Sequence, residues 1–520
     1  MLLNLSTFKE HNLTHCQKAA IEALEPLIEG DVQFGILKGY AGTGKTFLTS
    51  LIVKHLIENE QRVQVLTPTG RAAKVLKSEF IKHNIELAPA TIHSVIYSIN
   101  PVDYSKQQLS LFADVKTNEH EGPCFYIIDE SSMVGDEKRA KKEEGLNFGS
   151  GSLLHDIIEF VDPAFNEKAK ILFVGDPGQL APVDGSERTP ALTDAGLRSI
   201  LSDHEIDEVD IVSYELQEVL RQQEGSLIEF VSDVREAFMN KTSLPKNERQ
   251  DVKAIPTGST LEMYKEFTCE LQCPEKCVIL AHKNADVFQY NQSIRSFMGL
   301  GDNPIVLDDI LLVRRNRKVR YYGELDISRA QEALTNGTFI QVVGNPQRGY
   351  QRTITIRGKE IQLQFWNVKI KRVGSDYEFD AVLLQNMLDA SFWKDYRNQY
   401  SLVESAILVD FQLRMKEKHN LKPAKPGDAH YEEYSRKAER DPYLNAVRVN
   451  YGYAVTVHNA QGGEWDNVIV DPRHFKRELN GTQHLVSYAR WVYTASTRSK
   501  KKLYFIKHTP EEVLEMVGEG

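Results

Sequence analysis

The sequence predicts an α/β protein of two domains, each carrying an insertion. The first indication is a series of short, continuously apolar segments separated by helical patterns. Strands are expected at 33–37, 63–66, 125–128 and 171–174, and helices at 14–29 and 46–58. Short apolar strands between helices are typical of a parallel sheet that is covered on both faces. Strand patterns return at 467–470 and 503–506, which favours a second domain of the same kind.

Two stretches interrupt this alternation. Residues 97–123 are polar with alternating apolar positions, which predicts a small inserted hairpin. From residue 301 the segments alternate like antiparallel strands, which predicts a small β-barrel or sandwich, and a charged helical extension follows at 387–440. We therefore expect the first domain at 1–205, the second at 206–300 and 441–520, and the inserted β domain at 301–440.

The composition excludes several classes of protein. Of 520 residues, 41% are hydrophobic and 26% are charged, as in an average globular chain. With 63 basic and 73 acidic residues the net charge is −10, so any nucleic-acid site must be a local groove. No apolar run approaches the ~18 residues of a membrane span, and no secretory signal is visible. Five cysteines are too few for a disulfide scaffold, and we expect a cytoplasmic protein.

The strongest motif is a phosphate-binding loop at residues 39–46, which fits G-x-x-x-x-G-K-[ST]. A predicted strand precedes it and a predicted helix follows, as the motif requires. The backbone N–H groups around Gly42, Thr43 and Gly44 would converge on phosphate oxygens at the positive end of the helix. Lys45 would reach the β- and γ-phosphates, and the Thr46 hydroxyl would hold Mg²⁺. The sequence therefore predicts an ATP site.

Polar residues at two further strand ends extend this site. Asp129 and Glu130 follow a buried strand, so Asp129 is the expected Mg²⁺ partner and Glu130 would orient or deprotonate the attacking water. Gln179 follows the next strand and would sense the γ-phosphate, unless it belongs to a polar turn without a ligand. Gln17 completes a capping box with Thr14 and is also a candidate for the adenine edge; the two roles are compatible.

The remaining motifs carry a resemblance to a known family. They lie at 67–73, 91–94, 220–222, 453–462 and 493–498. Taken in order with the phosphate-binding loop, they resemble the motifs of superfamily 1 DNA helicases of the 5′→3′ branch, of the Dda- and RecD-like type. The resemblance covers nearly the whole chain. It implies two RecA-like P-loop domains, with the hairpin as a strand-separating pin and residues 301–440 as an SH3-like domain.

The resemblance assigns roles at matched positions. It implies that Gln17 recognises adenine and that Arg221 and Arg498, from the second domain, act as arginine fingers on the γ-phosphate. Gly462 and Glu464 would lie near the cleft between the domains and link the nucleotide to DNA.

The resemblance also implies a path for single-stranded DNA across both α/β domains. Candidate contacts are Pro68, Thr69, Thr91, His93, Thr456 and His458. Hydroxyls and imidazoles bond phosphates without adding much charge, although each of these side chains is equally suited to a cap or a core hydrogen bond. At the pin, Pro101 would contact DNA and Phe112 would stack on the last base pair, unless Phe112 packs the hairpin onto the body.

Some features depart from the family pattern or fall outside it. The family often has Lys where this chain has Asn459, and Ser where it has Gly463. Residues 134–152 are an insertion for which we expect only a solvated loop. The basic run at 314–320 would contact phosphates or form a solvated face.

The resulting hypothesis is an ATP-driven 5′→3′ DNA helicase that uses ATP and Mg²⁺. Single-stranded DNA and duplex forks are its expected partners, together with single-strand-binding or replication and repair proteins, and we expect a monomer. An ATP-gated clamp that grips DNA without unwinding remains an alternative, as does another P-loop NTPase such as a metabolic kinase. RNA is a possible substrate, because fold alone does not fix substrate. The direction of movement rests on the resemblance alone.

Overall fold

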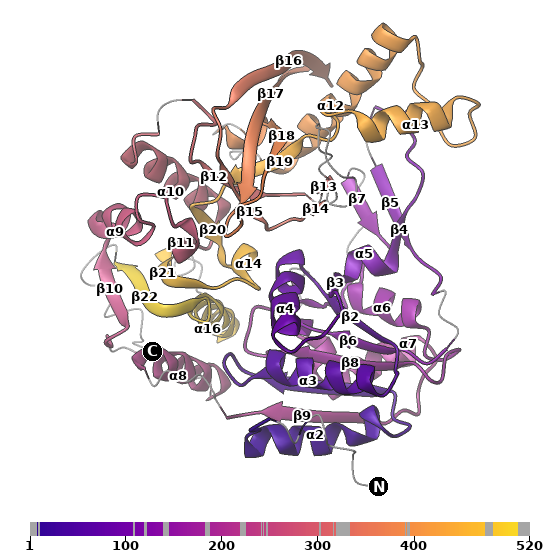
Figure 1. The fold of residues 1–520 in the computed structure, drawn as a ribbon, viewed down its shortest axis with the longest axis vertical. Coiled ribbons are helices and arrows are strands. Elements are labelled where there is room, and N and C mark those ends of the chain that lie inside the picture. Colours follow the sequence, from indigo (N-terminus) through magenta and orange to yellow (C-terminus); the bar gives the residue numbers. More distant parts are fainter. Residues whose placement is uncertain are drawn as a thin grey trace.

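The computed structural model of the chain describes residues 8, 11–107, 110–118, 122–138, 145–182, 188–218, 225–240, 242, 244–245, 248–300, 303–315, 317–318, 333–389, 392, 396–473 and 482–507. These residues form two parallel sheets, a β insertion with a helical extension, and a smaller three-stranded sheet (Figure 1). Within them, no helix has the length and apolar character needed to cross a membrane.

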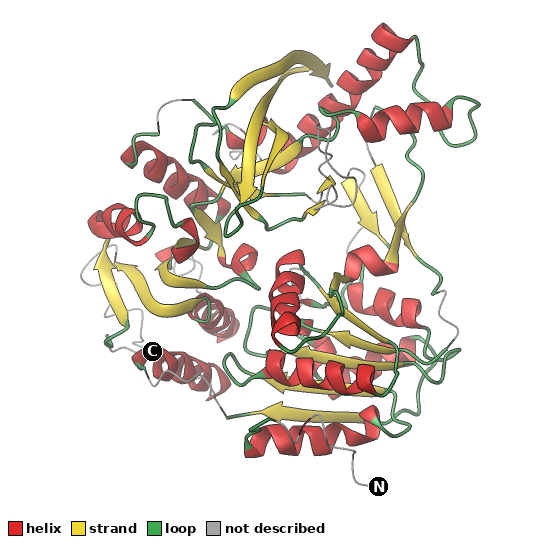
Figure 2. Ribbon diagram, in the orientation of Figure 1, coloured by secondary structure: helices red, strands yellow, loops and turns green. Residues whose placement is uncertain are grey.

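The first sheet is parallel and has helices on both faces (Figure 2). Its strands, in spatial order, are β3 (Ala90–Thr91), β2 (Val63–Thr67), β6 (Phe125–Ile128), β8 (Lys170–Gly175), β1 (Phe34–Gly39) and β9 (Ile211–Leu216). One face packs against α2 (His15–Ile28), α3 (Lys45–Glu58) and α4 (Gly70–Lys82), and the other against α5 (Ile92–Ile96), α6 (Leu153–Val161) and α7 (Asp194–Asp203). This covered parallel sheet confirms the predicted α/β fold.

The first sheet extends past the boundary expected at residue 205. Strand β9 pairs in parallel with β1, from Phe34 opposite Ile211 to Gly39 opposite Leu216. The sequence of β9 mixes polar and apolar residues, as suits an edge strand, and lacks the continuous apolar run of the inner strands. For that reason the apolar pattern did not reveal it.

The second sheet is also parallel. Its strands are β10 (Val252–Pro256), β22 (Ser499–Lys507), β21 (Trp465–Asp471), β11 (Cys277–Ala281) and β20 (Ala454–Thr456). The helices around it are α8 (Ser226–Asn240), α9 (Thr260–Phe267), α10 (Asn284–Phe297), α14 (Val457–Ala460) and α16 (Thr482–Ser496). The prediction of a second α/β domain is therefore confirmed.

The insertion forms a sheet that closes on itself. Its strands are β15 (Phe339–Val342), β12 (Ile310–Val313), β19 (Val447–Tyr451), β18 (Glu378–Leu384), β17 (Lys359–Arg372) and β16 (Gln347–Ile356). Because β15 pairs with both β12 and β17, five of these strands form a closed ring. Strand β19 lies past residue 440, so this sheet too extends beyond its expected boundary. Its core is continuous with that of the second domain, where Ile279 and Leu311 share one apolar cluster.

A helical extension leaves the inserted sheet. It consists of α12 (Tyr396–His419) and α13 (Tyr431–Arg440), which the sequence predicted as a charged helical segment. Of the basic run at 314–320, Arg317–Lys318 forms the short strand β13, paired with β14 (Ala333–Leu334). Arg315 donates to Glu404 on α12, so at least this member of the run has a structural partner.

The expected hairpin is part of a three-stranded sheet. Strands β4 (Tyr97–Ile99) and β5 (Ser110–Val115) are antiparallel, and β7 (Gly145–Phe148) pairs in parallel with β5. The Phe148 ring packs on the rings of Tyr97 and His93, with centroids 4.9 and 4.7 Å apart. The expectation of a solvated loop over 134–152 is therefore wrong for β7, because this strand pairs with β5 and its Phe148 packs on the hairpin; residues 139–144 lie outside the described part.

Candidate nucleotide site between the two α/β domains

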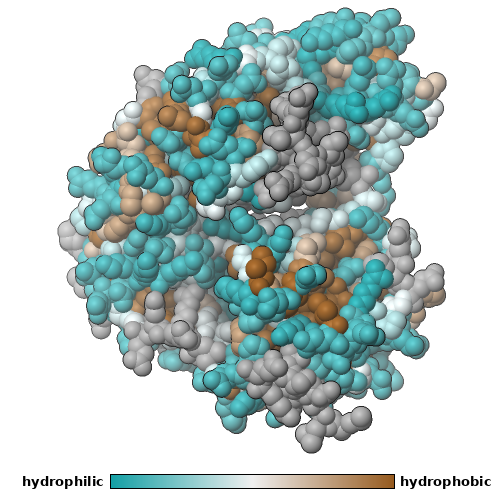
Figure 3. Space-filling model, viewed as in Figure 1, coloured by the Kyte–Doolittle hydropathy of each residue, from teal (hydrophilic) through white to brown (hydrophobic). Residues whose placement is uncertain are grey.

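A cavity of ≈530 Å³ lies where β1 meets the start of α3. Its lining residues are Asn12, Thr14, Gln17, Gly42, Gly44, Lys45, Thr46, Phe47, Glu79 and Glu464. All but Glu464 belong to the first domain. Figure 3 shows a hollow between the first domain and the upper part of the molecule, with both hydrophilic and hydrophobic surface along its border. The cavity therefore brings together the predicted phosphate loop, the capping-box residues and one residue of the second domain.

The phosphate loop has the backbone that its sequence predicts. Gly42 and Gly44 both have φ of 82°, a conformation that favours glycine. Gly44 caps α3 without a side-chain hydrogen bond, so the first N–H groups of the helix remain available to an anion. Lys45 Nζ donates to the carbonyl oxygens of Gly39 and Tyr40, at 2.6 and 2.9 Å. Thr43 is buried, and its hydroxyl donates to the Tyr40 carbonyl at 2.8 Å.

Two neighbouring carboxylates stand at the end of β6. Burial raises the pKa of Asp129 to about 7, the charge of Glu130 adds to the shift, and Lys45 opposes it. Burial likewise raises the pKa of Glu130, against the attraction of Arg498 and Lys45. Glu130 has φ of 55°, a left-handed backbone conformation that ends the extended course of β6. Two negative charges are unfavourable at this buried position, so Asp129 and Glu130 would be stabilised by a cation bound beside them.

Two glutamine amides have atoms without a partner. Gln179 is 4% exposed, and its Oε1 is buried without a hydrogen bond. Gln17 is 2% exposed, and its capping box with Thr14 is present, which confirms that prediction. The cap uses Oε1 of Gln17, which accepts from Thr14 N at 3.2 Å, whereas Nε2 is buried without a partner. Both amides therefore retain capacity for a ligand.

The second domain contributes a buried cation. Arg498 is 5% exposed and donates to the carbonyl oxygens of Thr494 and Gly463 and to the Thr497 hydroxyl. Its charge acts on Glu130 across the cleft. Gly462, nearby, has φ of 73°. The other predicted arginine finger, Arg221, lies outside the described residues.

A hydrogen-bond chain joins the two domains and was not foreseen from the sequence. The Tyr493 hydroxyl accepts from Ala41 N of the phosphate loop at 3.0 Å and donates to Asp176 Oδ2 at 2.8 Å. Leu180 N donates to the Thr494 hydroxyl at 2.9 Å. The two residues of the first domain that make these hydrogen bonds, Asp176 and Leu180, precede and follow Gln179 in the chain. Tyr493 lies in the motif at 493–498, and Asp176 closely follows the strand predicted at 171–174, but nothing in a single sequence shows that they meet.

The cavity also includes residues that the sequence analysis missed. Phe47 and Glu79 line it, and Phe47 packs on the rings of His11 and His83. The one available signal was that Phe47 directly follows the phosphate-loop threonine.

The candidate strand contacts lie at corresponding edges of the two sheets. Pro68 and Thr69 follow β2, Thr91 ends β3, and Thr456 ends β20. The carboxyl ends of parallel strands are where such sheets bind ligands. Thr69 and Thr456 also cap α4 and α14, accepting from Ala72 N and Asn459 N. The capping alternative is thus realised for both threonines, and half-buried Thr91 makes no such bond.

The two histidines differ in their surroundings. His93 is half-buried against the Phe148 and Tyr97 rings. Burial lowers the pKa of His458 to about 4, and the neighbouring His282 adds to the shift. His458 is therefore neutral at physiological pH, and any phosphate contact it makes is a hydrogen bond without a charge.

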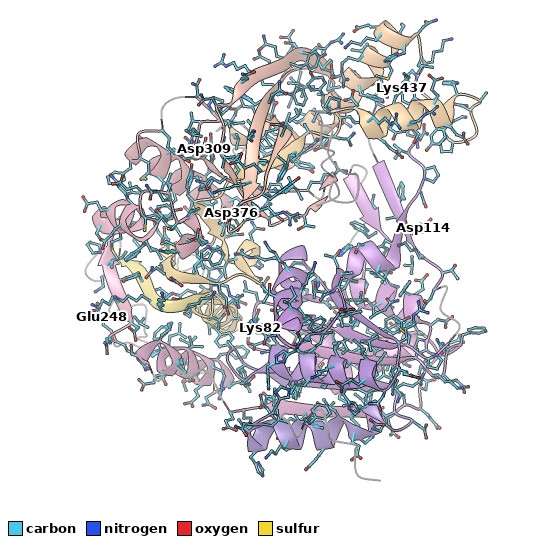
Figure 4. The ribbon with its side chains drawn as sticks, viewed as in Figure 1. Lys82, Asp114, Glu248, Asp309, Asp376 and Lys437 are labelled. Carbon is cyan, nitrogen blue, oxygen red and sulfur yellow. The ribbon has the colours of Figure 1, made fainter. Side chains whose placement is uncertain are left out.

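The hairpin leaves one aromatic ring free and is anchored at the far end. Phe112 on β5 is 43% exposed, and Pro101 is exposed as well. Asn100 donates to Asp114 on β5 at 2.7 Å (Figure 4 labels Asp114). Tyr104, beyond the strands, is buried against α12 and α13.

Tyr104 is held by the backbone as well as by its ring. Tyr104 N donates to Ala424 O at 2.9 Å, and Gln412 Nε2 donates to Tyr104 O at 2.6 Å. Its ring packs on those of Phe411 and Tyr434. The hairpin therefore bridges the first domain and the helical extension (Figure 1).

Comparison with known proteins gives two family matches in chain order. Residues 12–142 match an AAA domain, and residues 451–506 match a UvrD-like helicase C-terminal domain. The first match contains the phosphate loop and Glu130, and the second contains Gly462 and Arg498.

Individual relatives span most of the chain. The ATP-dependent DNA helicase dda of Enterobacteria phage T4 is 24% identical over 76% of this chain and 88% of that protein. An uncharacterized protein of Acanthamoeba polyphaga mimivirus is 23% identical over 95% and 99%. A crystal structure of Pif1 helicase from Bacteroides, with ADP-AlF3 and ssDNA, is 15% identical over 97% and 94%, with a TM-score of 0.45.

The fold, the motifs and the relatives agree. The candidate cavity is lined by the first α/β domain and by Glu464 of the second, and each of the two family matches contains lining residues. These similarities support a superfamily 1 helicase of the Dda-like type.

Proposed function

We propose that the chain is an ATP-dependent DNA helicase that moves 5′→3′ along single-stranded DNA and opens the duplex ahead of it. The observation that carries this proposal is that residues of both α/β domains line the cavity at the phosphate loop. A site assembled across a cleft couples nucleotide binding and hydrolysis to closure and opening of the cleft. The likeness to Dda supports DNA as the polymer, and the direction follows the motif resemblance.

In this proposal the nucleotide lies along the cavity from Gln17 to the phosphate loop. The free Nε2 of Gln17 donates to the adenine edge, while N–H groups around Gly42, Thr43 and Gly44 bind phosphates. Lys45 exchanges its two carbonyl acceptors for the β- and γ-phosphates.

Hydrolysis requires an oriented water and stabilisation of the γ-phosphate. Glu130 takes the proton of the water, a role that suits a carboxylate whose pKa is raised. Gln179 and Arg498 face the γ-phosphate from the two sides of the cleft, and Arg221 is proposed as a second finger. Glu464 closes the cavity from the second domain.

The donor set also fits Mg²⁺. The Thr46 hydroxyl and the Asp129 carboxylate are oxygen ligands of the kind that Mg²⁺ prefers, and the phosphates would complete its coordination. Among the described residues, no group of three or more His, Cys, Asp or Glu side chains forms a metal site. When bound, the ion would neutralise charge on the β- and γ-phosphates.

Single-stranded DNA would cross the strand ends of both sheets. The proposed contacts are Pro68, Thr69, Thr91, His93, Thr456 and His458. Since Thr69 and Thr456 stand at corresponding places in the two domains, closure of the cleft would shift one grip toward the other. Alternating grips convert that closure into movement along the strand.

The hairpin is the proposed pin. The exposure of Phe112 supports a ring that stacks on the last base pair, with Pro101 beside the strand. The anchored Tyr104 keeps the hairpin from yielding under load. We assign the closed inserted sheet as the SH3-like domain, and we place the end of the first domain after Leu216.

The test is unwinding of a DNA duplex that carries either a 5′ or a 3′ single-stranded tail, with ATP and Mg²⁺. We expect opening from the 5′ tail only, and no opening by Lys45→Ala. Opening from the 3′ tail only would contradict the proposed 5′→3′ direction but would still support a DNA helicase. If neither duplex opens while single-stranded DNA still stimulates ATP hydrolysis, the protein is an ATP-gated clamp.

A further inference from the structure

We propose that Arg71 is a positioning residue that ties the first domain to the second domain and to the inserted sheet, and that Gly463 is the residue that leaves room for it. This proposal rests on the proposed helicase function. It concerns the transmission of a nucleotide-driven movement, in which no role has been given to either residue.

The first turn of α4 lies in a three-way junction. Figure 1 shows α4 at the edge of the first domain that faces α14 and α16. A Cβ added at Gly70 would lie 2.5 Å from the Thr335 hydroxyl, which belongs to the turn before β15. A Cβ added at Gly462 would lie 3.3 Å from Ala72 N. The start of α4 is therefore enclosed by the inserted sheet on one side and the second domain on another.

The Arg71 guanidinium lies against two aromatic rings in this junction. Its Cζ is 4.3 Å from the Trp465 ring centroid and 5.1 Å from that of Phe339. The two rings are nearly perpendicular, at 81°, with centroids 6.0 Å apart. Trp465 begins β21 of the second domain, and Phe339 begins β15 of the inserted sheet. One cation thus joins rings from two other parts of the molecule.

Gly463 is required by Arg71 and not by its own backbone. Its φ lies outside the left-handed region in which glycine is favoured. A Cβ at this position would overlap the guanidinium carbon and both terminal nitrogens of Arg71. The serine that often occupies this place in similar helicases would therefore displace Arg71. The presence of Gly463 in place of the serine is therefore explained by its contact with Arg71 of the first domain.

The charge of Arg71 connects the junction to the nucleotide site. Its Nη1 is buried without a hydrogen bond. Burial lowers the pKa of Arg71 to about 9, the repulsion of Arg498 adds to the shift, and Glu464 opposes it. Both of these neighbours belong to the candidate nucleotide site. A γ-phosphate that engages Arg498 would offset part of the repulsion on Arg71, so the junction tightens when ATP binds.

The inserted sheet carries this change toward the duplex. Phe339 belongs to that sheet, from which α12 and α13 extend, and these helices hold Tyr104. Arg71 therefore stands on a path of packed elements from the nucleotide site to the hairpin.

The experiment is a double-mutant cycle with Arg71→Ala, Gly463→Ala and the double variant. We expect each single change to lower the base pairs opened per ATP hydrolysed by about tenfold, with the KM for ATP altered by less than about twofold. The double variant should be no worse than Arg71→Ala, because the added methyl group then has no guanidinium to displace. Gly258→Ala is the matched control, since a Cβ there meets nothing within 4 Å.

Additive losses in the double variant, or an unaffected Gly463→Ala protein, would overturn the proposal. The melting temperatures of the same variants give a second readout that does not depend on activity. Gly463→Ala should lower the melting temperature only when Arg71 is present. If the wild-type protein fails to unwind DNA, the helicase assignment is contradicted. The melting temperatures of the variants would still show whether Arg71 and Gly463 are in contact. The two failures are therefore distinguishable.

Discussion

Single carboxylates and imidazoles in the site have pKa values that follow from their surroundings. Glu130 is half-buried beside another carboxylate and interacts with the charges of Arg498 and Lys45, one from each domain. His458 is kept neutral by burial and by a second imidazole. These two side chains give predictions that concern one residue each, one for the chemistry and one for stability.

Replacing Glu130 by Gln should lower the kcat for ATP hydrolysis by about 10²- to 10³-fold, because the amide accepts no proton from water. ATP binding should persist, since Gln retains the size and removes a negative charge near the phosphates. Steady-state hydrolysis and equilibrium nucleotide binding measure the two effects. Glu137→Gln, an exposed change in the same segment, is the control and should act as wild type. Equal loss in both variants would contradict the assignment.

Acidification should destabilise the protein in part through His458. A histidine whose folded pKa is lowered favours folding above its unfolded pKa of 6.5, and this contribution is lost as the pH falls toward 4. His458→Gln should therefore reduce, by about 1 to 3 kcal/mol, the fall in unfolding free energy between pH 7 and pH 4.5. Urea unfolding at the two pH values tests this, and an unchanged pH dependence would contradict it.

At the scale of elements, the hairpin differs from the prediction, because it belongs to a three-stranded sheet and not to an isolated pair of strands. The insertion after Glu130 returns as β7 and widens the hairpin into three strands, which stiffens its base. Its far end is held by α12 and α13 through Tyr104. A hairpin fixed at both ends suits a wedge, and the exposed Phe112 is the ring that such a wedge would present.

Phe112→Ala should lower the rate of duplex unwinding by about tenfold, because stacking of a base on an aromatic ring contributes on the order of 1–3 kcal/mol. ATP hydrolysis stimulated by single-stranded DNA should remain nearly unchanged. Phe165→Ala removes a ring that is 84% exposed elsewhere on the first domain, and it serves as the control. Parallel loss of unwinding and hydrolysis would argue against the wedge.

At the scale of the whole molecule, hydrogen bonds across the cleft join the two α/β domains. Tyr493 is the most informative, because its hydroxyl bonds the phosphate loop and Asp176 at once. Tyr290 offers a matched comparison, since its buried hydroxyl donates to Asp471 at 2.7 Å within the second domain. The two residues share chemistry and burial and differ in whether the bond crosses the cleft.

Tyr493→Phe should lower the kcat of DNA-stimulated ATP hydrolysis by about tenfold, with a small change in the KM for ATP. Loss of the hydroxyl leaves Ala41 N and Asp176 without their partner on the other domain. Tyr290→Phe should cost stability and leave the kcat unchanged. If the two variants lower the kcat equally, the contact across the cleft has no special part in hydrolysis.

Much of this architecture was predictable because it follows local rules. Glycines in the phosphate loop, the Thr14–Gln17 box and the covered strands depend on neighbours within a few residues. The sequence did not reveal strand β9, which pairs with β1 beyond the boundary expected at residue 205, because an edge strand lacks the continuous apolar run that marks inner strands. The contacts of Arg71 and Tyr493 join positions hundreds of residues apart, and no periodicity or motif encodes such a pairing.

Two adjacent strands connect the inserted sheet to the second domain. β12 and β19 are antiparallel neighbours, with Leu311 opposite Tyr451, so the chain enters and leaves the insertion side by side. Asp309, at this attachment, accepts hydrogen bonds from Arg295 and Tyr453 (Figure 4). Such an attachment resists shear along the strands, because several hydrogen bonds would have to break together, and it yields more easily to rotation. A load on the hairpin tip would therefore reach the second domain as a torque.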